Sequence, residues 1–289
     1  MKKAWIMIVA LACIIGCVGC GAQAERVDVK NATNLSDLAG AKIAAQNGTF
    51  HAEAAQQIEN VQASTYPEFA DLLTALKSGA IDGYVAEEPT AKSVCKTDST
   101  LTYVPLVNND TGFTATAADV GIAVGLKTSS ALRDKINGAL ATVTEEQKQT
   151  LMEQSMALAA GETVEAFALA SEVPTAPNGT LKVGMECAYE PYNWTETEAK
   201  TMGAVPISGE GKEGLYANGY DVQMALYIAN KLGMKLEIYA IEWDSLLPAL
   251  ESGAIDAIVA GMSPTAEREE QIDFTQTYYE SNLVVIIKK

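Results

Sequence analysis

Two charged side chains stand out because each comes shortly after an apolar stretch that reads as a β-strand. Glu87 and its neighbour Glu88 follow residues 81–85, and Arg268 follows residues 255–259 at the start of a short helical pattern. Carboxylates bind ammonium groups, whereas a guanidinium fork and the N–H groups of a helix start bind an anion such as a carboxylate. Together these residues could hold one small molecule that carries a cation at one point and an anion at another.

The elements that must position these residues are two copies of one unit. Residues 72–82 return as residues 246–256 with two positions changed. Each copy predicts an amphipathic helix, a glycine that ends it and an apolar strand, which is one helix-to-strand unit of an α/β sheet. The copies diverge after the strand, where open α/β sheets bind ligands. We therefore expect two α/β lobes with the charged residues on facing strand ends.

Composition narrows the class of protein. The 289 residues suffice for two compact lobes, and the hydrophobic content of 48% is that of a globular chain. The net charge of −17, without any basic stripe, argues against nucleic acid and against direct docking on an anionic membrane surface.

The N-terminus resembles an export signal. Lys2 and Lys3 precede an apolar run at 4–15, which is the length of a secretory core and too short to span a bilayer. Cys17 and Cys20 both end strings that resemble a bacterial lipobox, in which the cysteine receives the lipid anchor. Either cysteine fits, and the alternative is an ordinary cleaved signal.

Two cysteines, Cys95 and Cys187, lie in the body of the chain. They fall in different lobes, so a disulfide would lock the lobes together. We expect two free thiols.

Element boundaries follow from periodicity and from turn residues. Two capping boxes, at 65–68 and 144–147, predict helix starts. Strands are predicted at 41–45, near 61, and at 81–85, 101–107, 120–124, 181–185, 236–240, 255–259 and 283–287. Helices are predicted from 50, at 66–77, 89–95 and 130–141, from 144, and at 221–232 and 245–251.

Several motifs resemble one family. In the second half of the chain they are 181–192, 219–221, 243–250, 260–263 with Arg268, 273–275 and 278–279. In the first half they are 38–43, 46–49, 78–82 and 121–124. They resemble the family-3 solute-binding proteins, the amino-acid receptors of bacterial ABC importers. The resemblance implies an α/β, two-lobed periplasmic-binding-protein-like (type II) fold with the ligand cleft between the lobes.

The order of the motifs differs from the family's. In the family, the equivalent of 181–289 comes first, so the chain resembles a circular permutation. The expected division is a lipoprotein signal peptide at 1–20, a tether at 21–32, lobe 2 at 33–117 and lobe 1 at 118–289. Within lobe 1 we expect a hinge strand and terminal helices at 118–159, a linker joining the old termini at 160–179 and the main α/β part at 180–289. Residues 120–124 and 283–287 are predicted to cross between the lobes.

The resemblance assigns roles at the charged ends of the ligand. Arg268, with Gly261 and Ser263, would bind the α-carboxylate; the alternative for Arg268 is a surface ion pair with its acidic neighbours. Glu87 would bind the α-ammonium, although the family usually has an aspartate there; the alternative is an exposed Glu87–Glu88 pair.

The second lobe would close on the carboxylate through the turn at 48–50, which brings Thr49 and Phe50 to the site. Tyr189 and Trp243 match the aromatic positions that sandwich the ligand side chain, and Tyr192 is a weaker third.

Glu186 is expected to select the side chain of the ligand, because relatives that bind cationic or amide side chains carry an acid at this position. The alternative is a partner for Arg268. His51 is the only histidine of the chain. Without a base partner or a metal cluster, it favours a structural role over pocket lining. We expect no catalytic site, no metal and no cofactor.

These observations predict an extracytoplasmic receptor, anchored to the cell membrane as a lipoprotein. It would be a monomer that binds a polar, basic L-amino acid by lobe closure and delivers it to an ABC transporter permease. Two alternatives are a small carboxylic-acid dehydratase on the same fold, with Glu186 as its acid, and a ligand-sensing module for a signalling partner.

Overall fold

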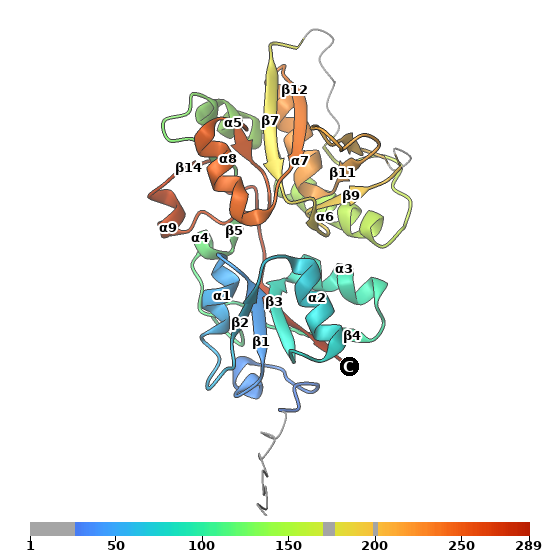
Figure 1. The fold of residues 1–289 in the computed structure, drawn as a ribbon, viewed down its shortest axis with the longest axis vertical. Helices are drawn as coiled ribbons and strands as arrows, with labels where there is room; N and C mark the ends of the chain where they lie inside the picture. The colour runs from blue at the N-terminus through green and yellow to red at the C-terminus, as the bar shows by residue number, and fades with distance from the viewer. Residues whose placement is uncertain (1–26, 170–176, 199–201) are drawn as a thin grey trace, which may run out of the picture.

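The computed structural model describes residues 27–169, 177–198 and 202–289. Two five-stranded sheets form two lobes, which are joined by a two-stranded ribbon. Figure 1 shows lobe 1 above lobe 2, with α4 and β5 between them. The predicted signal peptide, including Cys17 and Cys20, and part of the predicted linker lie outside the described residues.

The sheet of lobe 2 has the strand order β2-β1-β3-β16-β4. The strands β1 (Ile43–Gln46), β2 (Ser64–Tyr66) and β3 (Gly83–Glu87) are parallel, and β16 (Leu283–Lys288) runs antiparallel between β3 and β4 (Leu101–Val104). The helical elements are η1 (Leu35–Leu38), α1 (Phe50–Ala55), α2 (Phe69–Ser78) and α3 (Glu88–Thr97).

Strand β16 explains why residues 283–287 are uninterruptedly apolar. Leu283, Val285 and Ile287 pack into one apolar cluster, whereas Val284 and Ile286 pack into the other. A strand that is covered on both faces reads as a continuous apolar run instead of an alternating one. The C-terminal strand is therefore a central strand of lobe 2 (Figure 1).

The sheet of lobe 1 has the order β12-β7-β13-β6-β14. Its strands are β6 (Gly125–Leu126), β7 (Thr180–Met185), β12 (Lys235–Ala240), β13 (Ala257–Ile258) and β14 (Asp273–Phe274). A smaller sheet contains β8 (Ala188–Tyr189), β9 (Asn193–Glu196), β10 (Val205–Pro206) and β11 (Tyr216–Asn218). The helical elements are α5 (Leu132–Leu140), α6 (Glu145–Ala159), α7 (Tyr220–Lys231), η2 (Trp243–Ser245), α8 (Leu246–Ser252) and α9 (Ala266–Glu269).

The lobes are connected by the ribbon of β5 (Gly121–Ile122) and β15 (Tyr279–Glu280), which pair antiparallel next to α4 (Ala117–Val120). This corrects the predicted crossing at 283–287, because all of β16 lies in the sheet of lobe 2. The predicted extent of lobe 1, which ran to residue 289, is also wrong, because the C-terminal strand belongs to lobe 2. The periodicity showed a buried strand but not which sheet would pair with it.

The two copies of the repeated unit fold alike. Helices α2 and α8 both end at a glycine in the left-handed conformation, Gly79 (φ 80°) and Gly253 (φ 78°). In each copy the aspartate that ends the unit accepts a backbone hydrogen bond from the neighbouring segment. Asp82 bonds the N–H of Lys42 and Asp256 bonds that of Lys182, both at 2.9 Å. The repeated sequence thus encodes a helix stop and a strand-to-strand anchor.

Some local expectations are confirmed and others are wrong. Thr144 caps α6 through a reciprocal pair of hydrogen bonds with Gln147. The capping box at 65–68 is absent, because residues 64–66 pair with β1 and α2 begins at Phe69 without a side-chain cap. Cys95 and Cys187 are free, as expected. Within the described ranges, none of the helices has the length and apolar character needed to cross a membrane.

Candidate functional site

A small cavity lies where the two lobes meet. All predicted site residues except Glu186 and Tyr192 line it. They are Thr49, Phe50, Glu87, Tyr189, Trp243, Gly261, Ser263 and Arg268. Its free volume of about 20 Å³ is room for little more than one water, so the lobes are closed on each other.

Arg268 connects the lobes at this cavity. The residue is 7% exposed, and its guanidinium lies 5.1 Å from the centre of the Trp243 ring. Its Nη1 donates to the carbonyl of Ser263 at 2.9 Å, and its Nη2 donates to the carbonyl of Gly48, in lobe 2, at 2.7 Å. Burial lowers its pKa to about 10, which leaves the group charged at neutral pH.

The helix start that was expected to assist Arg268 is short. Helix α9 has four residues, and Thr265 at its N-cap makes no side-chain capping bond. The guanidinium is therefore the main positive group at this end of the cavity. It is not a surface residue paired with its acidic neighbours, because both of its hydrogen bonds go to backbone carbonyls.

Glu87 ends β3 and forms a buried pair with His51 of α1. Glu87 Oε1 lies 3.1 Å from His51 Nε2, and the two residues are 4% and 6% exposed. Their other polar atoms, Glu87 Oε2 and His51 Nδ1, have no hydrogen-bond partner. The alternative of an exposed Glu87–Glu88 pair is wrong, because only Glu88 turns outward, where it pairs with Lys92 at 2.8 Å. His51 lines the cavity, contrary to the structural role that the sequence favoured.

Glu186 lies behind the cavity, directly after β7. Its Oε1 accepts a hydrogen bond from Gln46 Nε2, in lobe 2, at 2.9 Å. Burial raises the pKa of Glu186 to about 9, and the nearby carboxyls of Glu68 and Asp244 add to this shift. Glu186 therefore holds a proton at neutral pH in this closed form. It is not the partner of Arg268, which was its alternative role.

Aromatic rings form the wall of the site. Tyr189 stacks with Phe69 of lobe 2 at 3.9 Å between ring centres, and with Tyr192 at 5.0 Å. The hydroxyl oxygens of Tyr189 and Tyr192 are buried without a hydrogen-bond partner. Tyr192 thus supports Tyr189 from within lobe 1, while Trp243 faces Arg268 instead.

The turn at Gly261 is held by a buried network. Asp221 is fully buried and accepts hydrogen bonds from Asn193 at 2.8 Å and from Tyr278 at 2.7 Å. The backbone of Gly261 also bonds Asp221, and burial raises the pKa of this carboxyl to about 6. Gly261 has φ 63°, and a Cβ there would approach the Tyr189 ring to 3.3 Å. A glycine is therefore required for the backbone to pass beside Tyr189.

Four lining residues were not predicted as site residues: Gln46, His51, Phe69 and Ala260. Gln46 and Ala260 belong to motifs that the sequence analysis used for the resemblance. His51 directly follows the turn at 48–50, and this position was the feature of the sequence that indicated a place in the cavity wall. Phe69 gave no signal, because a first-turn aromatic residue reads as ordinary core.

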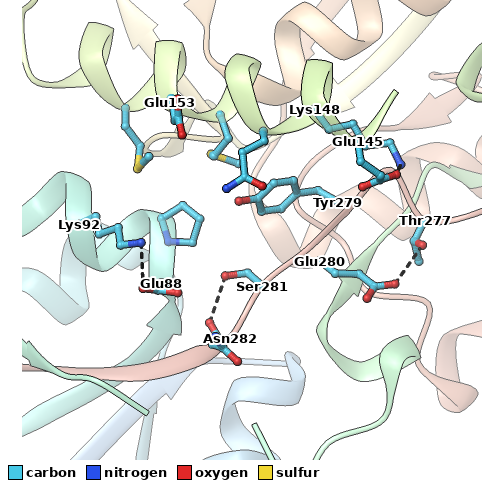
Figure 2. Close-up of a pocket in the computed structure, with 14 residues that line it drawn as sticks. Glu88, Lys92, Glu145, Lys148, Glu153, Thr277, Tyr279, Glu280, Ser281 and Asn282 are labelled. Atoms are coloured by element: carbon cyan, nitrogen blue, oxygen red, sulfur yellow. Dashed lines mark hydrogen bonds and ion pairs between the residues drawn. The ribbon is translucent and has the colours of Figure 1, made fainter. Parts of the chain in front are cut away.

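A larger hollow of about 540 Å³ lies at another part of the lobe junction, between α3, α6 and residues 277–282 (Figure 2). Its lysines are neutralised by neighbouring carboxylates. Lys92 pairs with Glu88 at 2.8 Å and Lys148 pairs with Glu145 at 2.6 Å. It contains none of the predicted site residues, so the small cavity is the better candidate.

Comparisons with known proteins found a matching family and several relatives. The family described as bacterial extracellular solute-binding proteins, family 3, matches residues 181–289. The arginine-binding extracellular protein ArtP of Bacillus subtilis is 40% identical over 80 residues, which are 28% of this chain and 31% of that protein. A probable histidine-binding protein of Campylobacter jejuni is 36% identical over 110 residues, 38% of this chain and 36% of that protein.

A solved structure of an ancestral arginine-binding protein bound to arginine is 35% identical. The match covers 35% of this chain and 38% of that one, with a TM-score of 0.28. The chain spans about a third of the length of the curated relatives that it matches.

Proposed function

We propose that this chain, whose residues 181–289 match the family described as bacterial extracellular solute-binding proteins, family 3, is an amino-acid receptor of that family. It binds a polar, basic L-amino acid between its lobes and delivers it to the permease of an ABC importer. The observation that carries this proposal is the cavity that brings Arg268 of lobe 1 and Glu87 of lobe 2 together.

The two ends of the cavity match the two charges of an amino acid. Arg268 binds the α-carboxylate, which takes the place of the Gly48 carbonyl as its acceptor, and Gly261 and Ser263 add contacts on the same side. Glu87 binds the α-ammonium through Oε2, which has no partner in the closed cavity. Charge-assisted bonds of this kind are roughly twice as strong as neutral ones, so they select for a zwitterion.

The turn of lobe 2 and the aromatic wall complete the site. The backbone N–H groups of Thr49 and Phe50 close on the carboxylate. The ligand side chain extends along the rings of Tyr189 and Trp243, and Tyr192 holds Tyr189 in place through the stacking at 5.0 Å.

A basic side chain is favoured by the acidic group beyond the rings. Glu68 and Asp244 lie near Glu186, and both disfavour a further negative charge there. A cationic head group that entered would compensate these carboxyls and let Glu186 ionise. The similarity to an arginine-binding extracellular protein supports this class of ligand.

Turnover is a weaker proposal than binding. A dehydratase would need an acid at the reacting carbon, and Glu186 has the raised pKa that such a role needs. Its Oε1, however, is occupied by Gln46, and Glu186 does not line the cavity. The two relatives named above are described as binding proteins. A sensing module for a signalling partner has no observation in its favour.

We propose further that the receptor acts as an extracytoplasmic lipoprotein, anchored through Cys17 or Cys20, and that it is a monomer. We also propose that the chain is a circular permutation. Supporting this, the family matches the later part of the chain, 181–289, while motifs of the family's remaining part precede it.

A thermal-shift survey of the twenty common amino acids tests the proposed function. Ligands that bind only the folded state raise the melting temperature, and the rise grows with the logarithm of ligand concentration divided by Kd. The proposal predicts the largest shift for arginine or lysine and a small one for aspartate. A survey without any shift, or with the largest shift for an acidic amino acid, would overturn it.

A further inference from the structure

His51 and Glu87 form a pair that lines the cavity, and each residue has one buried polar atom without a hydrogen-bond partner. The pair is joined at 3.1 Å through Nε2 and Oε1, with both side chains less than a tenth exposed. Nδ1 of His51 and Oε2 of Glu87 have no partner. Buried polar atoms without partners are rare in proteins, and each one calls for an explanation such as a ligand.

The charges in the cavity give that explanation. Its ionisable lining residues, other than the tyrosine, are His51, Glu87 and Arg268. In the empty cavity, His51 is the group in contact with Glu87 that would compensate its buried carboxylate when protonated. A zwitterion places its carboxylate at Arg268 and its ammonium at Glu87, so a protonated His51 would then face the ammonium, a like charge, at the same carboxylate. A like charge at close range disfavours the charged form of a titratable group, here the imidazolium of His51.

We propose that His51 is the resident counter-cation of Glu87, and that the ligand ammonium replaces it, so that binding releases one proton from the imidazole to solvent. This rests on the proposed function, which places the α-ammonium at Glu87. The neutral imidazole keeps its Nε2–H directed to Glu87 Oε1, and the lone pair of Nδ1 becomes an acceptor. The ammonium then has two acceptors, Glu87 Oε2 and His51 Nδ1.

The surroundings of the pair define what else can titrate. On α2, the Phe69 ring lies edge-on to His51 at 5.9 Å and carries no charge. Across the cleft, Arg268 lines the same cavity. The exposed carboxylate of Glu53 on α1 favours the charged form of Arg268 and so raises its pKa. Burial raises the pKa of Asp221 and of Tyr192, and the nearby charge of Glu87 adds to both shifts.

Two carboxyls could also exchange protons during binding. The pKa of Asp221 is raised to about 6 by burial, and that of Glu186 is raised to about 9 by burial and by Glu68. A cation at Glu186 would release a proton there as well. The test must therefore observe His51 itself and must compare the protein with a variant that lacks only the imidazole.

The sequence makes direct observation possible, because His51 is the only histidine in the chain. In protein prepared without a histidine tag, the proton resonance of the imidazole Cε1–H reports its protonation by nuclear magnetic resonance. At pH 6 we expect the position of a protonated imidazole without ligand, and a shift to the neutral position when L-arginine saturates the protein. A resonance that stays at the protonated position in the complex overturns the proposal.

Calorimetry supplies the second measurement. L-arginine is titrated at pH 6 in buffers of different ionisation enthalpy, so that the observed heat gives the number of protons released. Wild type should release up to one proton more than His51→Gln. Between pH 5 and pH 8 its affinity should therefore increase more steeply with pH than that of the variant, by up to about tenfold per pH unit. Asp221 and Glu186 are present in both proteins and cancel in the comparison.

The outcomes separate the two proposals. Binding with equal proton release in wild type and His51→Gln overturns the role of His51 and leaves the receptor function intact. Absence of amino-acid binding to wild type between pH 5 and pH 8 overturns both. The resonance measurement needs no variant, so the test remains valid if His51→Gln does not fold.

Discussion

Phe69 and Tyr189 stack face to face across the cleft, with ring centres 3.9 Å apart and planes inclined by 10°. Phe69 belongs to α2 of lobe 2 and Tyr189 to β8 of lobe 1, so the stack is a contact between the lobes. Together with the hydrogen bonds from Arg268 to Gly48 and from Gln46 to Glu186, it holds the lobes closed around a very small cavity. A ligand must therefore exchange some of these contacts for its own.

Replacement of Phe69 by alanine should open the ligand-free protein. The stack contributes about 0.5–1.5 kcal/mol beyond its buried area, which corresponds to a shift of roughly twofold to tenfold toward open lobes. Small-angle X-ray scattering should show a larger radius of gyration for Phe69→Ala than for wild type without ligand. Phe274→Ala, in β14 of lobe 1, is the control and should leave it unchanged. An equal radius for Phe69→Ala and wild type would mean that the stack does not hold the lobes.

Glu186→Gln should change the preference among ligands. If the cationic side chain of the ligand lies beside Glu186, the substitution should lower the affinity for arginine and lysine by roughly tenfold to a hundredfold, because the buried cation loses its compensating charge. The affinity for glutamine should fall by less than about threefold. Equal losses for arginine and glutamine, measured by calorimetry, would contradict the assignment of Glu186.

The raised pKa of Glu186 also predicts how stability depends on pH. Its value is about 9 in the folded protein and 4.5 in an unperturbed carboxyl. Between these values the folded state keeps a proton that the unfolded chain has released. This carboxyl therefore lowers the free energy of unfolding as the pH rises, by up to about 1.4 kcal/mol per pH unit.

Glu186→Gln removes this dependence. The ligand-free variant should gain stability relative to wild type as the pH rises from 5 to 8, when urea unfolding is compared at each pH. Glu242→Gln, which replaces an exposed carboxyl, is the control. A difference between Glu186→Gln and wild type that stays constant with pH would show that Glu186 does not keep its proton.

Deletion of residues 284–289 should be severe, although removal of a chain end is usually tolerated. It removes a strand that lies between β3 and β4 and is at most 1% exposed at Val284–Ile287. Loss of four buried aliphatic side chains costs about 6–12 kcal/mol, which is comparable to the whole stability of a domain. Thermal unfolding by circular dichroism should show loss of the cooperative transition, whereas deletion of Lys289 alone should preserve it. A melting temperature that is unchanged by the longer deletion would contradict the observed topology.

Local signals predicted the elements that carry the site. The repeated units became α2 with β3 and α8 with β13, and Thr144 caps α6 as its neighbours indicated. Residues 64–66 were misplaced because their strand exists through pairing with β1, which no local pattern encodes. The sheet to which β16 belongs was not predicted for the same reason.

In the site, too, residues placed by local sequence patterns were predicted, whereas residues placed by contacts with distant segments were not. Arg268 and Glu87 follow strand ends, so their positions were visible in the sequence. Phe69 and His51 were missed because their roles depend on partners from distant segments: Tyr189 in one case and Glu87 in the other. Glu186 was predicted, but its protonated state arises from burial and from Glu68 across the cleft.

The most direct test of the central claim is the affinity of Arg268→Ala for L-arginine, measured by calorimetry beside wild type. Without the guanidinium, the ligand carboxylate is left without its charge-assisted partner in a desolvated site, which costs about 2–4 kcal/mol, or roughly thirtyfold to a thousandfold in affinity. Arg133→Ala, at an exposed arginine of α5, is the matched control and should bind as wild type does. The account predicts that large loss for Arg268→Ala with an intact fold. A loss below about threefold would contradict it.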